Sequence, residues 1–155
     1  RISGIPNFFI DPIPAQMQTG KKWYEGTADA IYQNLNLIYD SDPDLVCVFG
    51  GDHIYKMEIS QMLRFHTKRH AELTVAAIPV PLHEAKHFGI IEVDDEWRMT
   101  GFVEKPIIPP KPMPNDPHHV LASMGNYVFE RNALVNELIL DAQFADSDHD
   151  FGKNI

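Results

Sequence analysis

Two stretches of the chain repeat apolar residues with the spacing of an amphipathic helix. In residues 27–39, Ile31 and Leu35 lie one turn apart on one face, and Ile38 continues that face. Thr27 stands at the start of this stretch, where its hydroxyl can cap the first turn. We predict a second helix at residues 58–69, whose apolar face carries Ile59, Met62, Leu63 and His66.

Two further stretches, residues 45–49 and 73–80, are almost continuously apolar and are bounded by turn residues. Such runs are typical of strands that are covered on both faces, as in a parallel sheet. Cys47 lies inside the first run, so we interpret it as a packed apolar side chain and not as a nucleophile. Because helices and strands alternate here, the sequence predicts an α/β fold with a mixed, mostly parallel sheet flanked by helices.

The second half of the chain has a different pattern. Residues 89–93 and 99–103 predict two short strands of a hairpin. Residues 121–129 predict a longer strand, and residues 132–140 predict a helix. Between and after these elements we predict a loop with five prolines at 107–117, a water-facing pair at His118 and His119, and a solvated acidic segment at 141–150.

Composition narrows the class of protein. The chain has 155 residues, of which 13 are basic and 22 acidic, so its formal net charge is −9. An acidic chain argues against a general nucleic-acid or membrane-surface partner, although a few local donors and a metal ion can still hold phosphate. The single cysteine excludes an internal disulfide framework. The sequence contains no run of 18 apolar residues, so we predict no transmembrane helix. We therefore expect neither a nucleic-acid nor a membrane partner, and a cytoplasmic location.

The strongest local signal for chemistry is Gly50-Gly51-Asp52, directly after the predicted strand at 45–49. Open α/β sheets bind ligands at the carboxyl ends of their strands, and glycines allow a ligand to approach the backbone closely. Asp52 is well placed to hold Mg²⁺ against phosphate oxygens, although a loop aspartate that makes a turn hydrogen bond fits the position equally well.

Two weaker signals accompany it. Gly26 and Thr27 open a predicted helix, where free backbone N–H groups favour an anion or a polar ring edge, although an ordinary helix cap explains the pair too. Glu104 and Lys105 close a predicted strand, where the ammonium group could bind phosphate and the carboxylate could accept sugar hydroxyls. The alternative interpretation is that these two charged residues simply face solvent at the end of the strand. Alternating polar or small residues on the last strand suggest a pocket wall, namely Ser123, Gly125 and Tyr127.

Residues 83–87 read HEAKH and so match the zinc metalloprotease pattern, which requires both histidines one turn apart on a sustained helix. Pro79 and Pro81 precede the segment and Gly89 follows it, so we expect too short a helix for this chemistry. A zinc hydrolase built on His83 and His87 is kept as a remote alternative.

Taken together, the motifs occur in an order that resembles a known family. They are PAQ at 14–16, WYEGTADA at 23–30, GDHIYK at 51–56, FVEKP at 102–106, ASMGNYVF at 122–129 and HDFG at 149–152. The series is similar to the bacterial glucose-1-phosphate adenylyltransferases, also called ADP-glucose pyrophosphorylases, over nearly the whole chain. The resemblance implies a Rossmann-like nucleotidyltransferase fold.

The resemblance also implies a reaction and a set of roles. The family joins ATP and glucose 1-phosphate to give ADP-glucose and pyrophosphate, with Mg²⁺, in bacterial glycogen synthesis. By matched position, Asp52 would be the catalytic and metal-binding aspartate. The nucleotide side would be formed by Gln16, Tyr24, Gly26 and Thr27. The sugar-phosphate side would be formed by Gly89, Glu104, Lys105, Ser123, Tyr127 and Asp150.

Several family features are missing from the sequence. The N-terminal glycine-rich loop, a second metal-binding aspartate and the C-terminal β-helix domain are not found in residues 1–155. We therefore expect a partial catalytic domain of an allosteric enzyme whose parent chain forms a homotetramer, and almost no activity from the segment alone. Two alternatives stay open: a transferase that uses UTP or dTTP, and a non-catalytic module that binds a nucleotide sugar.

Overall fold

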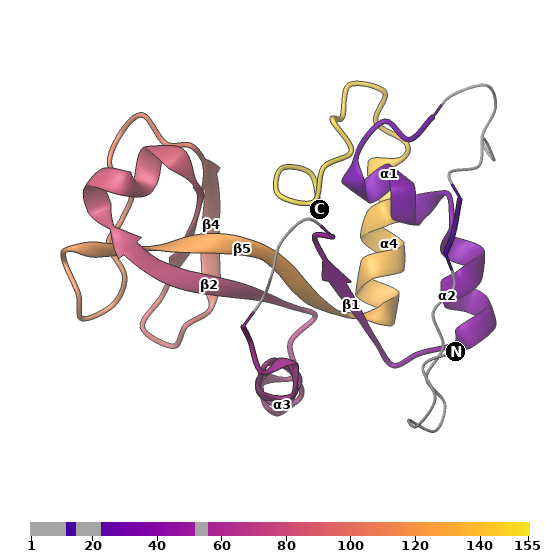
Figure 1. The fold of residues 1–155 in the computed structure, drawn as a ribbon, viewed down its shortest axis with the longest axis horizontal. Helices are drawn as coiled ribbons and strands as arrows, with labels where there is room; N and C mark the ends of the chain where they lie inside the picture. Colours follow the sequence, from indigo (N-terminus) through magenta and orange to yellow (C-terminus); the bar gives the residue numbers. More distant parts are fainter. Residues whose placement is uncertain (1–11, 15–22, 52–55) are drawn as a thin grey trace.

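One long strand, β5 (His119–Glu130), organises the computed structural model, which describes residues 12–14, 23–51 and 56–155. Strand β2 (Leu73–Pro81) pairs along one edge of β5, and β1 (Leu45–Phe49) pairs with the last residues of β5 on its other edge. Strand β3 (Gly89–Val93) pairs with β5 at Leu121 and Ala122, and β4 (Met99–Glu104) pairs with β3. The sheet therefore has β5 at its centre (Figure 1).

The predicted α/β class is confirmed, since helices flank a single sheet, but the predicted direction of the strands is wrong in the part of the chain that the structure describes. Each pairing there is antiparallel. Strands β1 and β2 run in the same direction but are separated by β5. The apolar runs correctly marked both strands, and β1 has the predicted bounds. Yet both strands are mostly half-buried, and Cys47 is exposed, so it is not the packed side chain that we expected.

The helix predicted at residues 27–39 is present as two short helices, α1 (Thr27–Tyr32) and α2 (Leu35–Ser41). Polar side chains at the junction explain the break. The Asn34 side-chain amide donates to the carbonyl of Ala30 at 2.8 Å and to the Tyr24 hydroxyl at 2.9 Å. Asparagine disfavours a helix interior because its side chain bonds to nearby backbone groups in this way.

The other two predicted helices are confirmed within a residue or two. Helix α3 (Ile59–Arg69) buries Met62 and His66, and His66 Nδ1 lies 2.8 Å from the Thr74 hydroxyl of β2. Helix α4 (Arg131–Asp141) follows β5 directly, and the Glu130 carboxylate caps it by accepting from the Ala133 backbone N–H at 2.8 Å. None of the helices in the described ranges is both long and apolar enough to cross a membrane.

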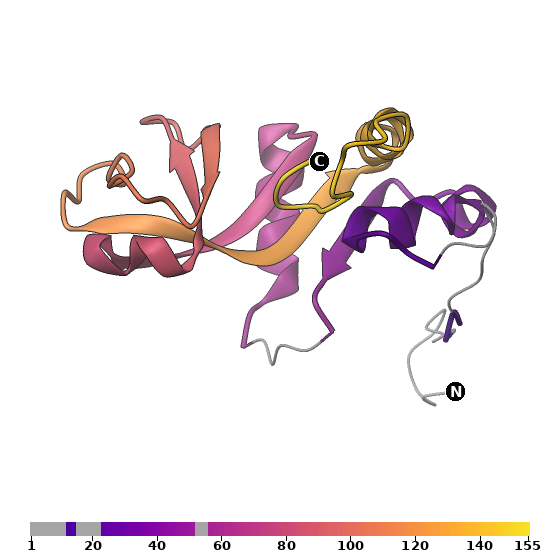
Figure 2. The same ribbon diagram turned by 90° about the horizontal axis from the view of Figure 1, so that it is seen from above.

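The two ends of β5 carry different structures (Figures 1 and 2). Helices α1, α2 and α4 gather with β1 at one end, over a core of Ala28, Ile38, Phe129, Leu134, Val135, Leu138 and Phe151. The predicted hairpin of β3 and β4 lies at the other end, with the 3₁₀ helix η1 (Leu82–His87). Two smaller core clusters there use Val120, Leu121 and Ala122 of β5. The chain after α4 returns toward the middle of β5, beside α1.

Candidate functional site

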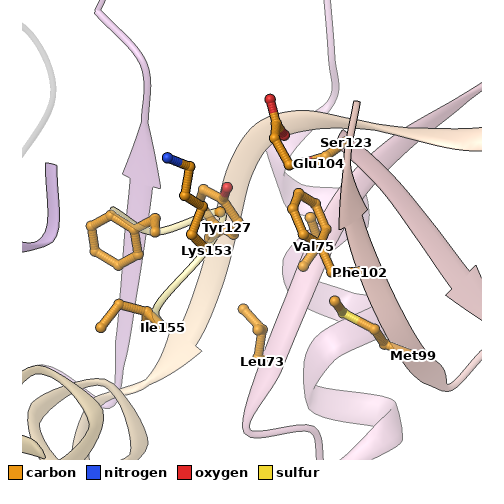
Figure 3. Close-up of a pocket in the computed structure, with 11 residues that line it drawn as sticks. Leu73, Val75, Met99, Phe102, Glu104, Ser123, Tyr127, Lys153 and Ile155 are labelled. Carbon is orange, nitrogen blue, oxygen red and sulfur yellow. The ribbon is translucent and has the colours of Figure 1, made fainter. Parts of the chain in front are cut away.

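A cavity of about 310 Å³ opens beside the middle of β5, where the C-terminal segment meets β2 and β4 (Figure 3). Its polar end carries the side chains of Glu104, Ser123, Tyr127 and Lys153. Its apolar end includes Leu73, Met99 and Ile155 (Figure 3). The remaining lining residues are Val75, Phe102, Phe151 and Gly152.

Three of the predicted sugar-phosphate residues line this cavity, and strands hold all three. Glu104 ends β4, whereas Ser123 and Tyr127 lie on β5, four residues apart, so the predicted pocket wall is confirmed for these two. Gly125 is not among the lining residues. It has a positive φ of 66°, opposite a register shift in β2. This irregularity is where β5 departs from simple alternation.

Burial raises the pKa of the Tyr127 hydroxyl, and the nearby carboxylates of Asp150 and Glu104 raise it further, while a hydrogen bond with Ser123 opposes the shift. Tyr127 therefore stays protonated at neutral pH and can donate a hydrogen bond to a ligand. The ring of Phe151 stacks on the Tyr127 ring, with centroids 5.6 Å apart. This contact fixes the tyrosine against the C-terminal segment.

Gly89 and Lys105 stand next to Glu104. Gly89 pairs with Glu104 across the hairpin, and a Cβ on Gly89 would lie 2.8 Å from Glu104 Oε2 and 2.5 Å from the Phe102 ring. The missing side chain thus leaves room for both groups. Lys105 is not among the residues that line the cavity, and its side chain is 66% exposed. Its Nζ lies 3.4 Å from Glu104 Oε1, so the ammonium group is at the rim.

Gly26 and Thr27 lie close to Asp150, although more than 120 residues separate this pair from Asp150 in the sequence. The Thr27 hydroxyl donates to Asp150 Oδ2 and accepts from the Phe151 backbone N–H, both at 3.2 Å. Thr27 therefore does not cap the helix as predicted. Gly26 is the N-cap residue, and no side-chain hydrogen bond caps α1. Residues predicted for the nucleotide and sugar sides thus join in one contact.

The other predicted nucleotide residues lie elsewhere or are not described. Tyr24 accepts a hydrogen bond from the Asn34 side chain at the break between α1 and α2. Gln16 and Asp52 lie outside the described residues, so their predicted roles stay predictions. Strand β1 does end just before Gly50 and Gly51, as expected. Within the described ranges, no group of three or more His, Cys, Asp or Glu side chains has the arrangement of a metal site.

The acidic segment at 141–150 is not simply solvated, contrary to the prediction. Asp141 is buried, His149 is largely buried, and the two side chains contact each other at 2.6 Å. The sequence reasoning also missed Lys153, which lines the cavity and donates to Asp148 at 2.7 Å. That hydrogen bond raises the pKa of Lys153. The HDFG motif was the available signal, since Lys153 follows it directly.

The histidine-rich segments also differ from a metalloprotease site. His83 and His87 lie on η1, a 3₁₀ helix of six residues, in which positions i and i+4 do not share a face as they do on an α-helix. Both histidines are exposed and approach Glu84 at 3.2 and 3.9 Å. His119 is the first residue of β5 and contacts Asp116 at 2.8 Å, so only His118 of that pair faces water freely as predicted.

A sheet flanked by helices, with a cavity at its centre that has one polar end, agrees with the nucleotidyltransferase fold that the motifs implied. The family model for nucleotidyl transferases matches residues 6–155, and the chain belongs to this family. Among individual proteins, it is 62% identical over 154 residues to "Glucose-1-phosphate adenylyltransferase 1" of Vibrio parahaemolyticus, which covers 99% of this chain. It is 58% identical over 155 residues to "Glucose-1-phosphate adenylyltransferase" of Anaeromyxobacter dehalogenans. The chain spans 38% of the length of each of these curated relatives.

Proposed function

We propose that the chain is the central part of the catalytic domain of a glucose-1-phosphate adenylyltransferase. In this reaction, a phosphate oxygen of glucose 1-phosphate attacks the α-phosphorus of ATP. The bond from that phosphorus to the bridging oxygen breaks, and ADP-glucose and pyrophosphate form. One observation carries the proposal. The cavity gathers Glu104, Ser123 and Tyr127 in a chain that is 62% identical to a relative of this name.

The cavity chemistry fits a sugar phosphate. The Glu104 carboxylate accepts hydrogen bonds from sugar hydroxyls, while the protonated Tyr127 hydroxyl and Ser123 can donate or accept. Lys105 at the rim supplies a point charge for the phosphate. Phosphoryl transfer depends mainly on positioning and charge neutralisation, which is what such a set of side chains provides.

The nucleotide half of the reaction falls to residues nearer the N-terminus. We assign the nucleotide side to Gln16, Tyr24, Gly26 and Thr27, and the binding of Mg²⁺ to Asp52. When bound, Mg²⁺ would neutralise charge on the phosphates of ATP. Within the described ranges, Gly26 and Thr27 adjoin Asp150, which supports a nucleotide side next to the sugar side. The same proposal includes glycogen synthesis as the pathway, the cytoplasm as the location, and an allosteric homotetramer as the assembly.

The test measures pyrophosphate release by the intact protein that contains this chain, with glucose 1-phosphate and ATP, UTP or dTTP in turn. We expect turnover with ATP, a large rise in KM for glucose 1-phosphate in Glu104→Gln, and almost no turnover in Asp52→Asn. Glu96→Gln, at an exposed position in the β3–β4 turn, is the matched control and should behave as the wild type.

The other outcomes identify the alternatives. Preference for UTP or dTTP would place the protein among other sugar-1-phosphate nucleotidyltransferases. Binding of ADP-glucose without turnover of any nucleotide would identify a non-catalytic module. Residues 1–155 alone should show almost no turnover, and measurable turnover by this segment would contradict that expectation.

A further inference from the structure

Three side chains at and after the C-terminal end of α4 form a largely buried polar cluster to which the proposed reaction gives no role. Asp141 is the last residue of α4, and its side chain is 7% exposed. The Ser147 hydroxyl donates to Asp141 Oδ1 at 2.5 Å, and His149 Nδ1 lies 2.6 Å from Asp141 Oδ2. Because an ionised carboxylate only accepts hydrogen bonds, Nδ1 of His149 is the protonated nitrogen. We call Asp141, Ser147 and His149 the latch.

The order of these contacts does not suit nucleophilic catalysis. The Ser147 hydroxyl donates a hydrogen bond to the carboxylate and accepts one from the His149 backbone N–H at 3.0 Å. A serine nucleophile needs a base within hydrogen-bond reach of its hydroxyl, and here the imidazole is bonded to the far oxygen of Asp141. These contacts therefore indicate a structural role, in which Asp141 holds the segment that contains Ser147 and His149.

The latch holds the segment that joins the first turn of α1 to the cavity. The carbonyl of His149 accepts from the Ala28 backbone N–H at 2.8 Å. The next residue, Asp150, accepts from the Thr27 hydroxyl. Phe151 and Lys153 then line the cavity. One anchored segment therefore contacts both sides of the proposed site.

We propose that Asp141 and His149 are positioning residues, which fix residues 149–153 so that Asp150 stays bonded to Thr27 and Lys153 stays at the cavity. This inference rests on the proposed function. Strands hold Glu104, Ser123 and Tyr127, whereas no helix or strand is formed by residues 142–155. The orientation of that segment therefore depends on side-chain anchors such as the latch.

The test introduces Asp141→Asn into the intact protein. This substitution keeps the size of the side chain, but its NH₂ group then faces one of the two hydrogen-bond donors, Ser147 or His149. We expect KM for glucose 1-phosphate to rise about tenfold, within the roughly hundredfold that a 1 Å misplacement can cost, with a smaller change in kcat. Hydrogen exchange at the Ala28 amide should become faster. Asp146→Asn is the matched control, because it removes the same charge from an exposed position in the same segment and should change neither value.

Two further variants separate positioning from general loss of stability. Ile90→Val trims the fully buried Ile90 in the core cluster of the hairpin end and should leave KM unchanged. The double variant Asp141→Asn/Asp150→Asn should raise KM by less than the product of the two single effects, because both act through one segment.

Unchanged KM and unchanged exchange at Ala28 in Asp141→Asn would overturn the inference, as would an equal rise in KM from Ile90→Val. If the wild-type protein transfers no AMP, the proposed function fails. The exchange experiment, which needs no activity, then still shows whether the latch holds α1.

Discussion

Replacing Gly26 with alanine adds one methyl group at the start of α1, where the structure leaves no room for it. The new Cβ would lie 2.3 Å from the carbonyl oxygen of His149 and 2.4 Å from that of Asp148. Both atoms belong to the backbone, so a side-chain rotation cannot relieve the contact. The backbone of residues 148–149 would have to retreat by more than half an ångström. The hydrogen bond from Ala28 to His149 would weaken with it.

The magnitude follows from three effects. Overpacking of this kind costs about 1–3 kcal/mol. Loss of the hydrogen bond between Ala28 and His149 adds about 1 kcal/mol. The lower entropy of the unfolded chain offsets about 0.4–1 kcal/mol of this, since φ at Gly26 is −174° and alanine adopts it without strain. We expect a net loss of about 1–3.6 kcal/mol, or roughly 2–14 °C in Tm for a domain of this size.

Equilibrium urea unfolding of Gly26→Ala, compared with Gly51→Ala, is the assay. Gly51 is exposed, and apart from the residue itself and its chain neighbours, no atom of the described residues lies within 4 Å of the position that its new Cβ would take. Its φ is not positive either, so this substitution should leave stability unchanged or slightly higher. A Gly26→Ala variant within about 0.5 kcal/mol of the Gly51→Ala variant would refute the reasoning, because both variants carry the same added methyl group.

Three other substitutions test other features of the fold. Gly125→Ala meets no steric obstacle but must adopt φ of 66°, so it should lose about 1–2 kcal/mol in urea unfolding, and an unchanged midpoint would contradict this. Asn126 is fully buried on β5, and neither of its side-chain amide atoms has a partner among the described residues. Asn126→Leu should therefore keep or raise stability, whereas a loss above about 1 kcal/mol would reveal a partner. Burial lowers the pKa of His66 below its ordinary value of 6.5, because the folded protein disfavours the charged imidazole. The neutral side chain therefore contributes its full stabilisation above pH 6.5, and this contribution is lost as the pH falls through the folded-state pKa. When the pH is lowered from about 7.5 to about 5.5, the urea midpoint should decrease, and it should decrease less in His66→Gln. An equal pH dependence of the midpoint in both proteins would exclude His66 as the cause.

Local patterns predicted those elements whose identity depends on near neighbours in the sequence. The apolar run at Leu45–Phe49 marks β1 to the residue, and the turn after Val93 marks the hairpin. The direction of β1 was not predictable in the same way. An apolar run marks a strand, but it contains no information on which strand lies beside it, and here the neighbour is the antiparallel β5.

The misinterpreted segment at 141–150 shows a second limit. Four aspartates without a basic residue are typical of a solvated stretch, and Asp146 and Asp148 are indeed exposed. Asp141 is buried because Ser147 and His149 supply donors from the same segment after the chain turns back. The composition of the segment gives its number of charges. It cannot show that Asp141 is buried, because that burial depends on a side-chain arrangement that forms only in the folded chain.

The same distinction separates the site residues that the sequence predicted from those it missed. Glu104, Ser123 and Tyr127 are held by strands, so a recognised strand also placed its side chains at the cavity. Lys153 reaches the cavity only because the latch and the stack of Phe151 on Tyr127 return the segment to β5. The side of the cavity formed by strands is therefore built into the sheet. The opposite side depends on the anchors of one irregular segment, so substitutions there should change ligand binding before they change the fold.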